Sequence, residues 1–341
     1  MSRETHAEVT LLRLAGSLVI TSILTAALYA GRAQAGDLPL KQVTDVPLSG
    51  ATTRMDYASL DARDGRLYIA HLGDSMVTVF DTATGKVIQD IHGLGHVHGV
   101  LVIPELDRVY ASATQTDEIA VIDVHTLHVI ARIPGGRYPD GMAYAPAVHK
   151  LYVSDEAGAT ETVIDLATDT RIATLQLGGE AGNSQYDPVS GHVFVNVQTR
   201  GDLVEIDPGS DRVVARHPLA GARGNHGLLI DSAERLAFIA CEDDDRLLVV
   251  DMRSMTVVSS FDVGGEPDVL AYDPGLRRLY VAGEKGVVSV FKVERGVVGK
   301  LGEGSVGGNA HVVAVDPRDH RVYFPLKDVD GVPLLRVMAP D

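Results

Sequence analysis

Histidine and aspartate recur at one position of a repeated segment, and these residue types bind metal ions and transfer protons. The segment Gly95-His-Val-His-Gly-Val-Leu-Val-Ile-Pro104 returns in altered form six more times, at intervals of about 42 residues. At the place of His98 the seven copies carry Asp56, His98, Asp140, Gly182, His226, Asp268 and His311. We call these seven the ring residues, because the repeat argued below arranges them around one axis.

Three interpretations fit this pattern. The ring could bind a divalent metal: Zn²⁺ suits imidazole with carboxylate, and Ca²⁺ or Mg²⁺ would suit a site dominated by carboxylates. It could instead perform metal-free acid/base chemistry, with His98, His226 or His311 as the base. In the third interpretation each side chain caps a turn and the mixed charges form ion pairs. Carboxylates facing one channel repel one another unless a cation or a protonated histidine lies between them, which disfavours capping alone, and we favour the metal site. Its predicted ligands are Asp56, His98, Asp140, His226, Asp268 and His311.

The elements that must position these residues follow from the spacing of one aromatic side chain. It occurs once in each copy, twelve residues after the ring residue, as Tyr68, Tyr110, Tyr152, Phe194, Phe238, Tyr280 and Tyr323. A repeat of 40–45 residues that is rich in short strands is typical of a β-propeller blade. We therefore predict an all-β fold, a seven-bladed β-propeller of four-stranded antiparallel blades, with these aromatic residues in the core.

Strands are predicted within each copy from alternation and turn residues. In the third copy they cover residues 141–145, 150–154, 161–165 and 171–176. The seventh copy, with strands at 310–315, 321–324 and 333–337, ends one strand short. Residues 40–48 match the outer strands, so this N-terminal strand is predicted to complete the last blade and cover its open edge.

Short motifs in the repeats carry a resemblance to a known family. They are Leu151-Tyr-Val-Ser-Asp155, Val121-Ile-Asp123, Asp81-Thr-Ala-Thr-Gly85 and Val263-Gly-Gly-Glu-Pro267. The chain resembles the YVTN-repeat β-propeller family over residues 38–340. The resemblance implies the fold; the family's functions are heterogeneous and include periplasmic and surface binding proteins. Its consensus has no His or Asp at the ring position.

Other polar residues are predicted to lie near the ring. Most precede a ring residue by one or two positions and could form a polar rim that binds a ligand. His71 follows the first repeat aromatic and is a candidate for a second layer of ligands. The position after it carries Glu156, Glu242 and Glu284 in other copies, but the run Glu242-Asp-Asp-Asp245 is interpreted as a solvated loop. The predicted ligand-binding residues are Arg54, His71, His96, Tyr138, Asn225, Glu266 and Asn309.

The first 35 residues have the pattern of a signal peptide. Arg3 and Arg13 precede a largely apolar run, and Ala33-Gln34-Ala35 forms a small-x-small cleavage site. We expect cleavage there and a single propeller domain over residues 36–341; the alternative is retention of this segment as a membrane anchor. The protein is therefore expected in the periplasm or outside the cell. A single cysteine, Cys241, allows no internal disulfide.

Charge and missing motifs narrow the function. The formal net charge of −16 disfavours binding to nucleic acid, and no segment after the cleavage site is long enough to span a membrane. The sequence has no Cys-x-x-Cys-His, phosphate loop or Gly-x-Ser-x-Gly motif. We expect a metal and a small polar ligand at the ring, with metal-assisted hydrolysis of a lactone-like substrate, or a lyase reaction, as the possible chemistry. The alternative is a non-catalytic module that binds another exported protein, a glycan or a cofactor; the oligomeric state is left open.

Overall fold

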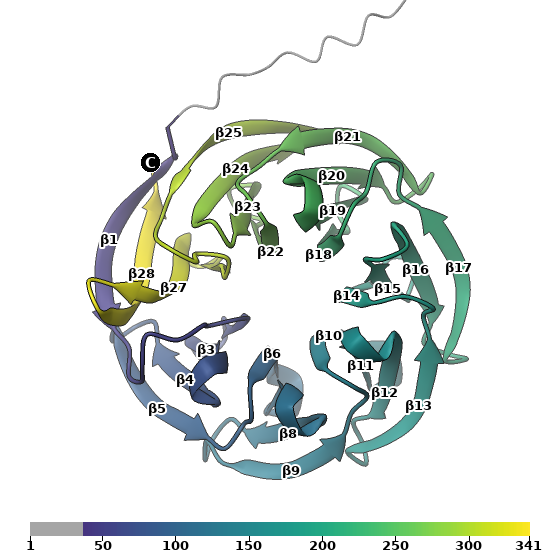
Figure 1. The fold of residues 1–341 in the computed structure, drawn as a ribbon, viewed down its shortest axis with the longest axis horizontal. Helices are drawn as coiled ribbons and strands as arrows, with labels where there is room; N and C mark the ends of the chain where they lie inside the picture. The colour runs from purple at the N-terminus through teal and green to yellow at the C-terminus, as the bar shows by residue number, and fades with distance from the viewer. Residues whose placement is uncertain (1–36) are drawn as a thin grey trace, which may run out of the picture. The chain divides into compact units, whose positions relative to one another are not determined.

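The computed structural model describes residues 37–341, which form seven four-stranded antiparallel sheets arranged in a ring (Figure 1). The predicted seven-bladed β-propeller is confirmed. The predicted signal peptide lies outside the described residues. Within residues 37–341 no helix is both long and apolar enough to cross a membrane.

The first three blades follow the chain, each with its inner strand first and its outer strand last. Blade one contains β2 Ala58–Asp61, β3 Arg66–His71, β4 Met76–Asp81 and β5 Lys86–His92. Blade two contains β6 Val97–Ile103, β7 Arg108–Ala113, β8 Glu118–Asp123 and β9 Val129–Pro134. Blade three contains β10 Pro139–Ala145, β11 Lys150–Asp155, β12 Thr160–Asp165 and β13 Thr170–Gln176. All four strands predicted for the third copy are present, each extended at an end by one or two residues.

The next three blades repeat the order. Blade four contains β14 Ala181–Asp187, β15 His192–Val197, β16 Asp202–Asp207 and β17 Arg212–Pro218. Blade five contains β18 Asn225–Asp231, β19 Leu236–Cys241, β20 Arg246–Asp251 and β21 Thr256–Asp262. Blade six contains β22 Pro267–Asp273, β23 Arg278–Gly283, β24 Val287–Glu294 and β25 Val297–Ser305.

The last blade combines the two ends of the described chain. It contains β26 Ala314–Asp316, β27 Arg321–Val329, β28 Val332–Pro340 and, as its outer strand, β1 Leu40–Pro47. The predicted closure by the N-terminal strand is confirmed: β1 pairs antiparallel with β28, from Leu40 opposite Pro340 to Pro47 opposite Leu334. The inner strand differs from the prediction, because residues 310–313 precede β26 and are not part of it.

Six short 3-10 helices connect strands at the two ends of the blades. Three of them, η1 Leu72–Asp74, η3 Thr114–Thr116 and η5 Glu156–Gly158, follow the second strands of blades one to three, and η6 Glu242–Asp244 does so in blade five. The other two, η2 Pro104–Leu106 and η4 Pro146–Val148, follow inner strands and so lie at the opposite end of their blades. The connections after the second strands therefore belong to the same end as the ring residues.

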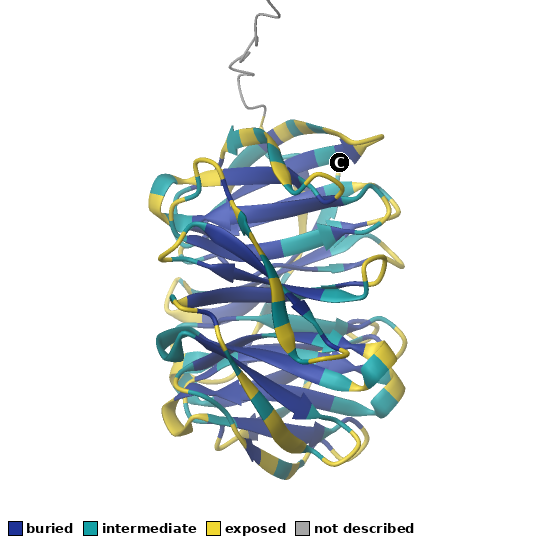
Figure 2. Cartoon of the chain, turned by 90° about the vertical axis from the view of Figure 1, so that its right-hand side faces the viewer, coloured by how far each residue is buried: buried dark blue, intermediate teal, exposed yellow. Residues whose placement is uncertain are grey.

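The core lies between neighbouring blades. The seven repeat aromatics are at most 2% exposed, which confirms their predicted place in the core. Each apolar cluster joins two adjacent blades; one, for example, packs Tyr68 and Val79 of blade one against Val100 and Val109 of blade two. Burial is concentrated in the strands, and the loops and outer strands carry most of the exposed residues (Figure 2). This packing fixes the inner strands around the central channel.

Candidate functional site

In five of the seven blades a β-bulge lies at the ring position. In five blades the register of the inner strand against the second strand shifts at the ring residue, for instance between Val97 and Val100, which flank His98. A bulge interrupts pairing and re-aims a side chain, and bulges are common beside functional sites. Asp56 and His311 differ, since they precede β2 and β26. Asp56 stays tied to the second strand through its backbone N–H, which lies 2.8 Å from the carbonyl oxygen of Ala70.

Blade four leaves a gap in the ring because its inner strand approaches the next blade too closely. A Cβ atom on Gly182 would lie 2.8 Å from the carbonyl oxygen and 2.9 Å from the Cα of His226. Any other residue would force the two inner strands apart. The missing ligand in this copy therefore has a steric cause.

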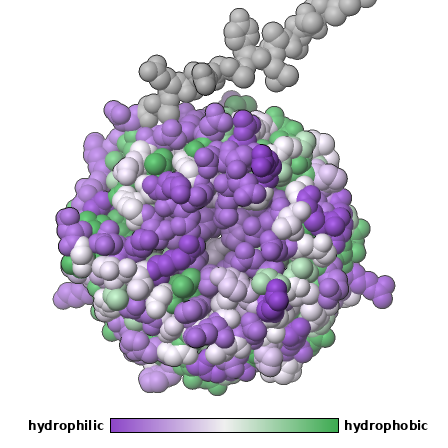
Figure 3. All heavy atoms as spheres, in the orientation of Figure 1, coloured by the Kyte–Doolittle hydropathy of each residue, from purple (hydrophilic) through white to green (hydrophobic). Residues whose placement is uncertain are grey.

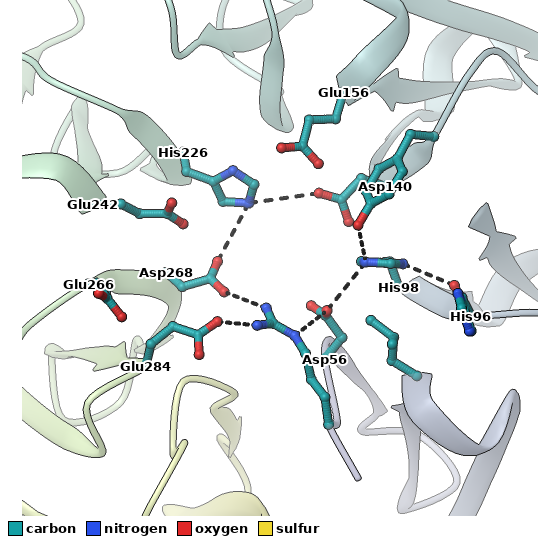
Figure 4. Close-up of a pocket in the computed structure, with 13 residues that line it drawn as sticks. Asp56, His96, His98, Asp140, Glu156, His226, Glu242, Glu266, Asp268 and Glu284 are labelled. Atoms are coloured by element: carbon teal, nitrogen blue, oxygen red, sulfur yellow. Dashed lines mark hydrogen bonds and ion pairs between the residues drawn. The ribbon is translucent and has the colours of Figure 1, made fainter. Parts of the chain in front are cut away.

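Five of the seven ring residues line a polar pocket of about 500 Å³ at the mouth of the channel (Figure 4), whereas Gly182 and the fully buried His311 do not line it. Hydrophilic side chains gather around the central hollow of this molecule (Figure 3). The lining includes seven carboxylates and a single arginine, so the pocket is strongly acidic. The lining residues are Arg54, Asp56, Leu72, His96, His98, Tyr138, Asp140, Glu156, His226, Glu242, Glu266, Asp268 and Glu284.

His98 is held by three hydrogen-bonding groups. Its Nδ1 lies 2.9 Å from the carbonyl oxygen of His96 and 2.7 Å from Oγ1 of Thr114, and its Nε2 lies 2.9 Å from the hydroxyl of Tyr138. Because a carbonyl oxygen only accepts, Nδ1 carries the proton, and Tyr138 donates to Nε2. Burial lowers the pKa of His98, with Asp56 opposing that shift, so the neutral ring is favoured. The lone pair of His98 is thus already engaged.

His311 is completely buried and keeps a free lone pair. Its Nδ1 lies 3.2 Å from the carbonyl oxygen of Asn309, so Nδ1 carries the proton of the neutral ring. Its Nε2 has no hydrogen-bond partner and lies 3.9 Å from Oδ2 of Asp268. Burial lowers the pKa of His311 and disfavours a second proton. An acceptor nitrogen therefore faces carboxylate oxygens with no hydrogen bond between them.

The backbone carbonyls that orient His98 and His311 come from equivalent positions two residues upstream. His96 has a φ of 47° and Asn309 a φ of 60°, both in the left-handed region. Such a conformation is uncommon outside glycine and is found where local structure requires it. In metal-binding histidines, the N–H of the second ring nitrogen usually donates a hydrogen bond to a carbonyl or carboxylate in this way.

His226 lies on the opposite side of Asp268. Its Nε2 lies 3.0 Å from the hydroxyl of Tyr57, 3.5 Å from Oδ1 of Asp268 and 3.8 Å from Oδ2 of Asp140. The Tyr57 hydroxyl donates a hydrogen bond to Oδ1 of Asn183 at 2.7 Å, and so it accepts a hydrogen bond from the Nε2–H of His226. His226 consequently carries a proton on Nε2, in the midst of two carboxylates.

Arg54 reaches from the rim to three carboxylates. Its Nε lies 3.2 Å from Oδ2 of Asp56, a terminal nitrogen lies 3.9 Å from Oδ2 of Asp268, and the other pairs closely with Glu284. These carboxylates raise the pKa of Arg54 despite the opposing effect of burial. The guanidinium supplies part of the positive charge that the pocket requires.

Burial, together with the negative charge that Arg54 does not neutralise, raises the pKa of several carboxyl groups in the pocket. Burial, and then repulsion from Asp56, raises the pKa of Asp140 well above its ordinary value. Burial also raises the pKa of Asp268 to about 8, although His226 lowers it, and repulsion from Asp56 adds to the rise. Burial and the charge of Glu284 raise the pKa of Glu242 to about 7. Protons or cations are therefore needed to keep this pocket stable.

The ring residues do not converge on one point. Within residues 37–341, two groups of three bring their ligand atoms within 4.8 Å of one another: Asp56, Asp268 and His311, and His226, Glu242 and Asp268. Both groups could hold a metal ion. His98 and Asp140 belong to neither group and border the pocket instead.

Three of the predicted ligand-binding residues lie outside the pocket lining. His71 is buried at the end of β3, where its Nε2 lies 3.0 Å from Oγ1 of Thr53. The Asn225 amide donates to Asn196 and to the carbonyl of Asp202 between strands. Asn309 donates a hydrogen bond to Oε2 of Glu284 at 2.5 Å and so helps to position this pocket-lining side chain. The rim residues Arg54, His96, Tyr138 and Glu266 do line the pocket.

Three glutamates that form an acidic wall of the pocket, Glu156, Glu242 and Glu284, were not among the site residues predicted from the sequence. Glu156 and Glu242 begin η5 and η6, and Glu284 follows β23, so all three occupy the position four residues after the repeat aromatic. Interpreting Glu242 as part of a solvated loop was wrong, because its side chain lines the pocket. The sequence pattern that could have revealed these residues is the recurrence of glutamate at one position in three blades. Cys241 beside it is buried, and burial raises the pKa of its thiol to about 12.

The fold and the site define a seven-bladed β-propeller with an acidic, histidine-containing pocket at the mouth of its channel. No protein-family model matches the chain, and no curated protein matches it. Among solved structures the chain is similar to one from Kuenenia stuttgartiensis hydrazine synthase, with a TM-score of 0.72 and 16% identity, over 87% of this chain and 98% of that chain. This likeness concerns the fold alone. The resemblance to YVTN repeats stays a prediction.

Proposed function

We propose that Asp56, Asp268 and His311 bind a divalent cation, and that the pocket above them receives a small polar ligand. The observation that carries this proposal is the Nε2 of His311, which is buried, unpartnered and directed at two carboxylates. A proton on Asp268 relieves part of the repulsion, but a cation satisfies all three groups together. The cation therefore competes with protons for the same oxygens.

The ligand chemistry favours Zn²⁺ over Ca²⁺ or Mg²⁺. Imidazole nitrogen suits zinc and its neighbours in the transition series, whereas Ca²⁺ and Mg²⁺ prefer oxygen ligands alone. The three protein groups would leave a coordination position for a ligand from the pocket. Arg54 must then release Asp56 and Asp268, and it can keep its ion pair with Glu284.

The test is a Zn²⁺ titration of the purified, chelator-treated protein by calorimetry. We expect binding in the wild type and at least a tenfold loss of affinity in His311→Ala and Asp56→Asn. The matched control is His125→Ala, because that side chain is 65% exposed and lies outside the pocket. Asp56→Asn keeps the side-chain volume, so it tests the proposal even if His311→Ala unfolds. Absence of binding in the wild type, or equal affinity in all variants, would overturn the proposal.

A second candidate function is hydrolysis or elimination on a lactone-like substrate, and His226 is the observation that favours it. Its Nε2 proton lies beside Asp268, the carboxylate shared with the proposed cation site. His226 would transfer a proton, and the metal would act as a Lewis acid. A panel of lactones and esters tests this function. Turnover that His226→Gln abolishes without loss of the cation bound by Asp56, Asp268 and His311 is expected; no turnover on the panel rejects it.

Export to the periplasm or the medium is part of the proposal and rests on residues 1–35. Fractionation of cells that express the full chain, with mass spectrometry of the mature N-terminus, checks it. We expect the mature protein to begin near Gly36. A full-length chain in the membrane fraction would instead indicate a retained anchor.

A further inference from the structure

The two oxygens of Asp268 face different histidines. Oδ1 lies 3.5 Å from Nε2 of His226, and Oδ2 lies 3.9 Å from Nε2 of His311. In Figure 4, Asp268 extends toward His226, and its Oδ2 also lies 3.9 Å from a terminal nitrogen of Arg54. This one carboxylate therefore belongs to both groups of potential metal ligands. A carboxylate that presents one oxygen to each of two sites can bridge two cations.

The second group has unsatisfied atoms of its own. The ligand atoms of His226, Glu242 and Asp268 lie within 4.8 Å of one another. Asp268 is only 3% exposed, and its Oδ1 has no hydrogen-bond partner. The neighbouring Asp140 is also 3% exposed with Oδ1 unpartnered. Buried polar atoms are nearly always satisfied in folded proteins, so these oxygens indicate a missing partner.

The charge of the pocket agrees with more than one bound cation. Seven carboxylates line it, and Arg54 is the only arginine among the lining residues. One divalent ion together with Arg54 supplies three positive charges, which leaves a large excess of negative charge in a confined volume. A second divalent ion reduces this excess beside Glu242, on the side of the pocket that Arg54 does not contact.

We propose that His226, Glu242 and Asp268 bind a second divalent cation, with Asp268 bridging it to the first. This inference rests on the proposed function for the first ion. The proton on Nε2 of His226 must move to Nδ1 when Nε2 binds the metal, so that the imidazole stays neutral, while the Tyr57 hydroxyl keeps its hydrogen bond to Asn183. Two bridged cations would also offset most of the negative charge of the pocket, so that a small anionic ligand could bind at the cations in a pocket that otherwise repels it.

The experiment is a titration of the chelator-treated protein with Mn²⁺, followed by calorimetry and by electron paramagnetic resonance. We expect two ions per chain in the wild type and one in Glu242→Gln. Two ions bridged by a carboxylate should give the spectrum of a magnetically coupled pair at saturation, and Glu242→Gln should give that of an isolated ion. Glu105→Gln is the matched control, because Glu105 is exposed in η2 at the other end of its blade.

The variants separate this inference from the proposed function. A single ion that His311→Ala or Asp56→Asn removes and Glu242→Gln retains would overturn the second site and leave the first. No bound ion in the wild type would overturn both. Two ions that persist in Glu242→Gln would overturn the assignment of Glu242. Loss of the coupled spectrum in Asp268→Asn is expected, and its persistence would overturn the bridge.

Discussion

The Nε of Arg54 lies 3.2 Å from Oδ2 of Asp56, so the proposed cation site already contains a positive group supplied by the chain. The guanidinium contacts the same Oδ2 of Asp268 that faces His311. Arg54 and a metal ion would therefore compete for these oxygens.

Replacing Arg54 by methionine should strengthen cation binding. The variant removes the competing charge and keeps much of the side-chain volume, and we expect the Kd for Zn²⁺ to fall about tenfold, or about 1.4 kcal/mol. Calorimetric titration at fixed pH and ionic strength measures it. Arg63→Met serves as the control, because Arg63 pairs with Asp61 and Asp107, away from the pocket. Unchanged or weaker binding in Arg54→Met would contradict the competition.

The contribution of Asp268 to the stability of the metal-free protein should fall as the pH rises from about 4 to about 8. The ordinary pKa of an aspartate, 3.8, applies to Asp268 in the unfolded chain, and burial raises it to about 8 in the folded protein. Between these values Asp268 is protonated more often in the folded than in the unfolded state, so this group destabilises the folded state as the pH rises. Thermal unfolding with chelator across this range measures the effect.

The variant Asp268→Asn should flatten this part of the pH profile, because the amide does not titrate. Saturating Zn²⁺ should raise the Tm of the wild type most at the upper end of the range, where protons no longer compete with the metal. A profile that is the same in wild type and Asp268→Asn would show that Asp268 is not the responsible group.

The Tyr57 hydroxyl should contribute to stability across the channel. It donates to Asn183 of blade four at 2.7 Å and accepts from His226 of blade five. Tyr57→Phe should lower the free energy of unfolding by about 1–2 kcal/mol, because two buried polar groups lose a partner. Urea denaturation measures this. Asn183→Ala provides a double-mutant cycle, in which additive losses would show that the two residues are not coupled.

Removing β1 should open blade seven. Deletion of residues 37–48 exposes the backbone edge of β28 and removes Asp45, whose Oδ2 lies 2.7 Å from a terminal nitrogen of Arg336. We expect aggregation and loss of a cooperative thermal transition, since an unpaired edge invites pairing with other chains. The control is a chain that begins at residue 36. A peptide of residues 37–48 added in trans should restore the transition; a deletion variant as stable as the control would refute this role.

The sequence was sufficient to predict the architecture because the repeat imposes it. The spacing of the aromatic residues set the number of blades, and the missing strand in the last copy identified β1 as its partner. The ring position could be predicted for the same reason. The arrangement of these side chains into two groups of potential metal ligands could not be predicted, because it depends on distances between side chains from different blades. The hydrogen bonds that distinguish His98 from His311 likewise arise from neighbours that the repeat does not share.

The pairing of β1 with β28 also constrains how the chain folds. Leu40 lies opposite Pro340, so the contact that completes the ring joins residues 300 positions apart. Contacts between residues so far apart in the sequence slow folding. During synthesis on the ribosome, β1 has no strand to pair with until β28 has been made. In a circularly permuted protein whose chain starts between two intact blades, the four strands of every blade would follow one another in the sequence. We expect the permuted protein to fold faster while keeping the same pocket.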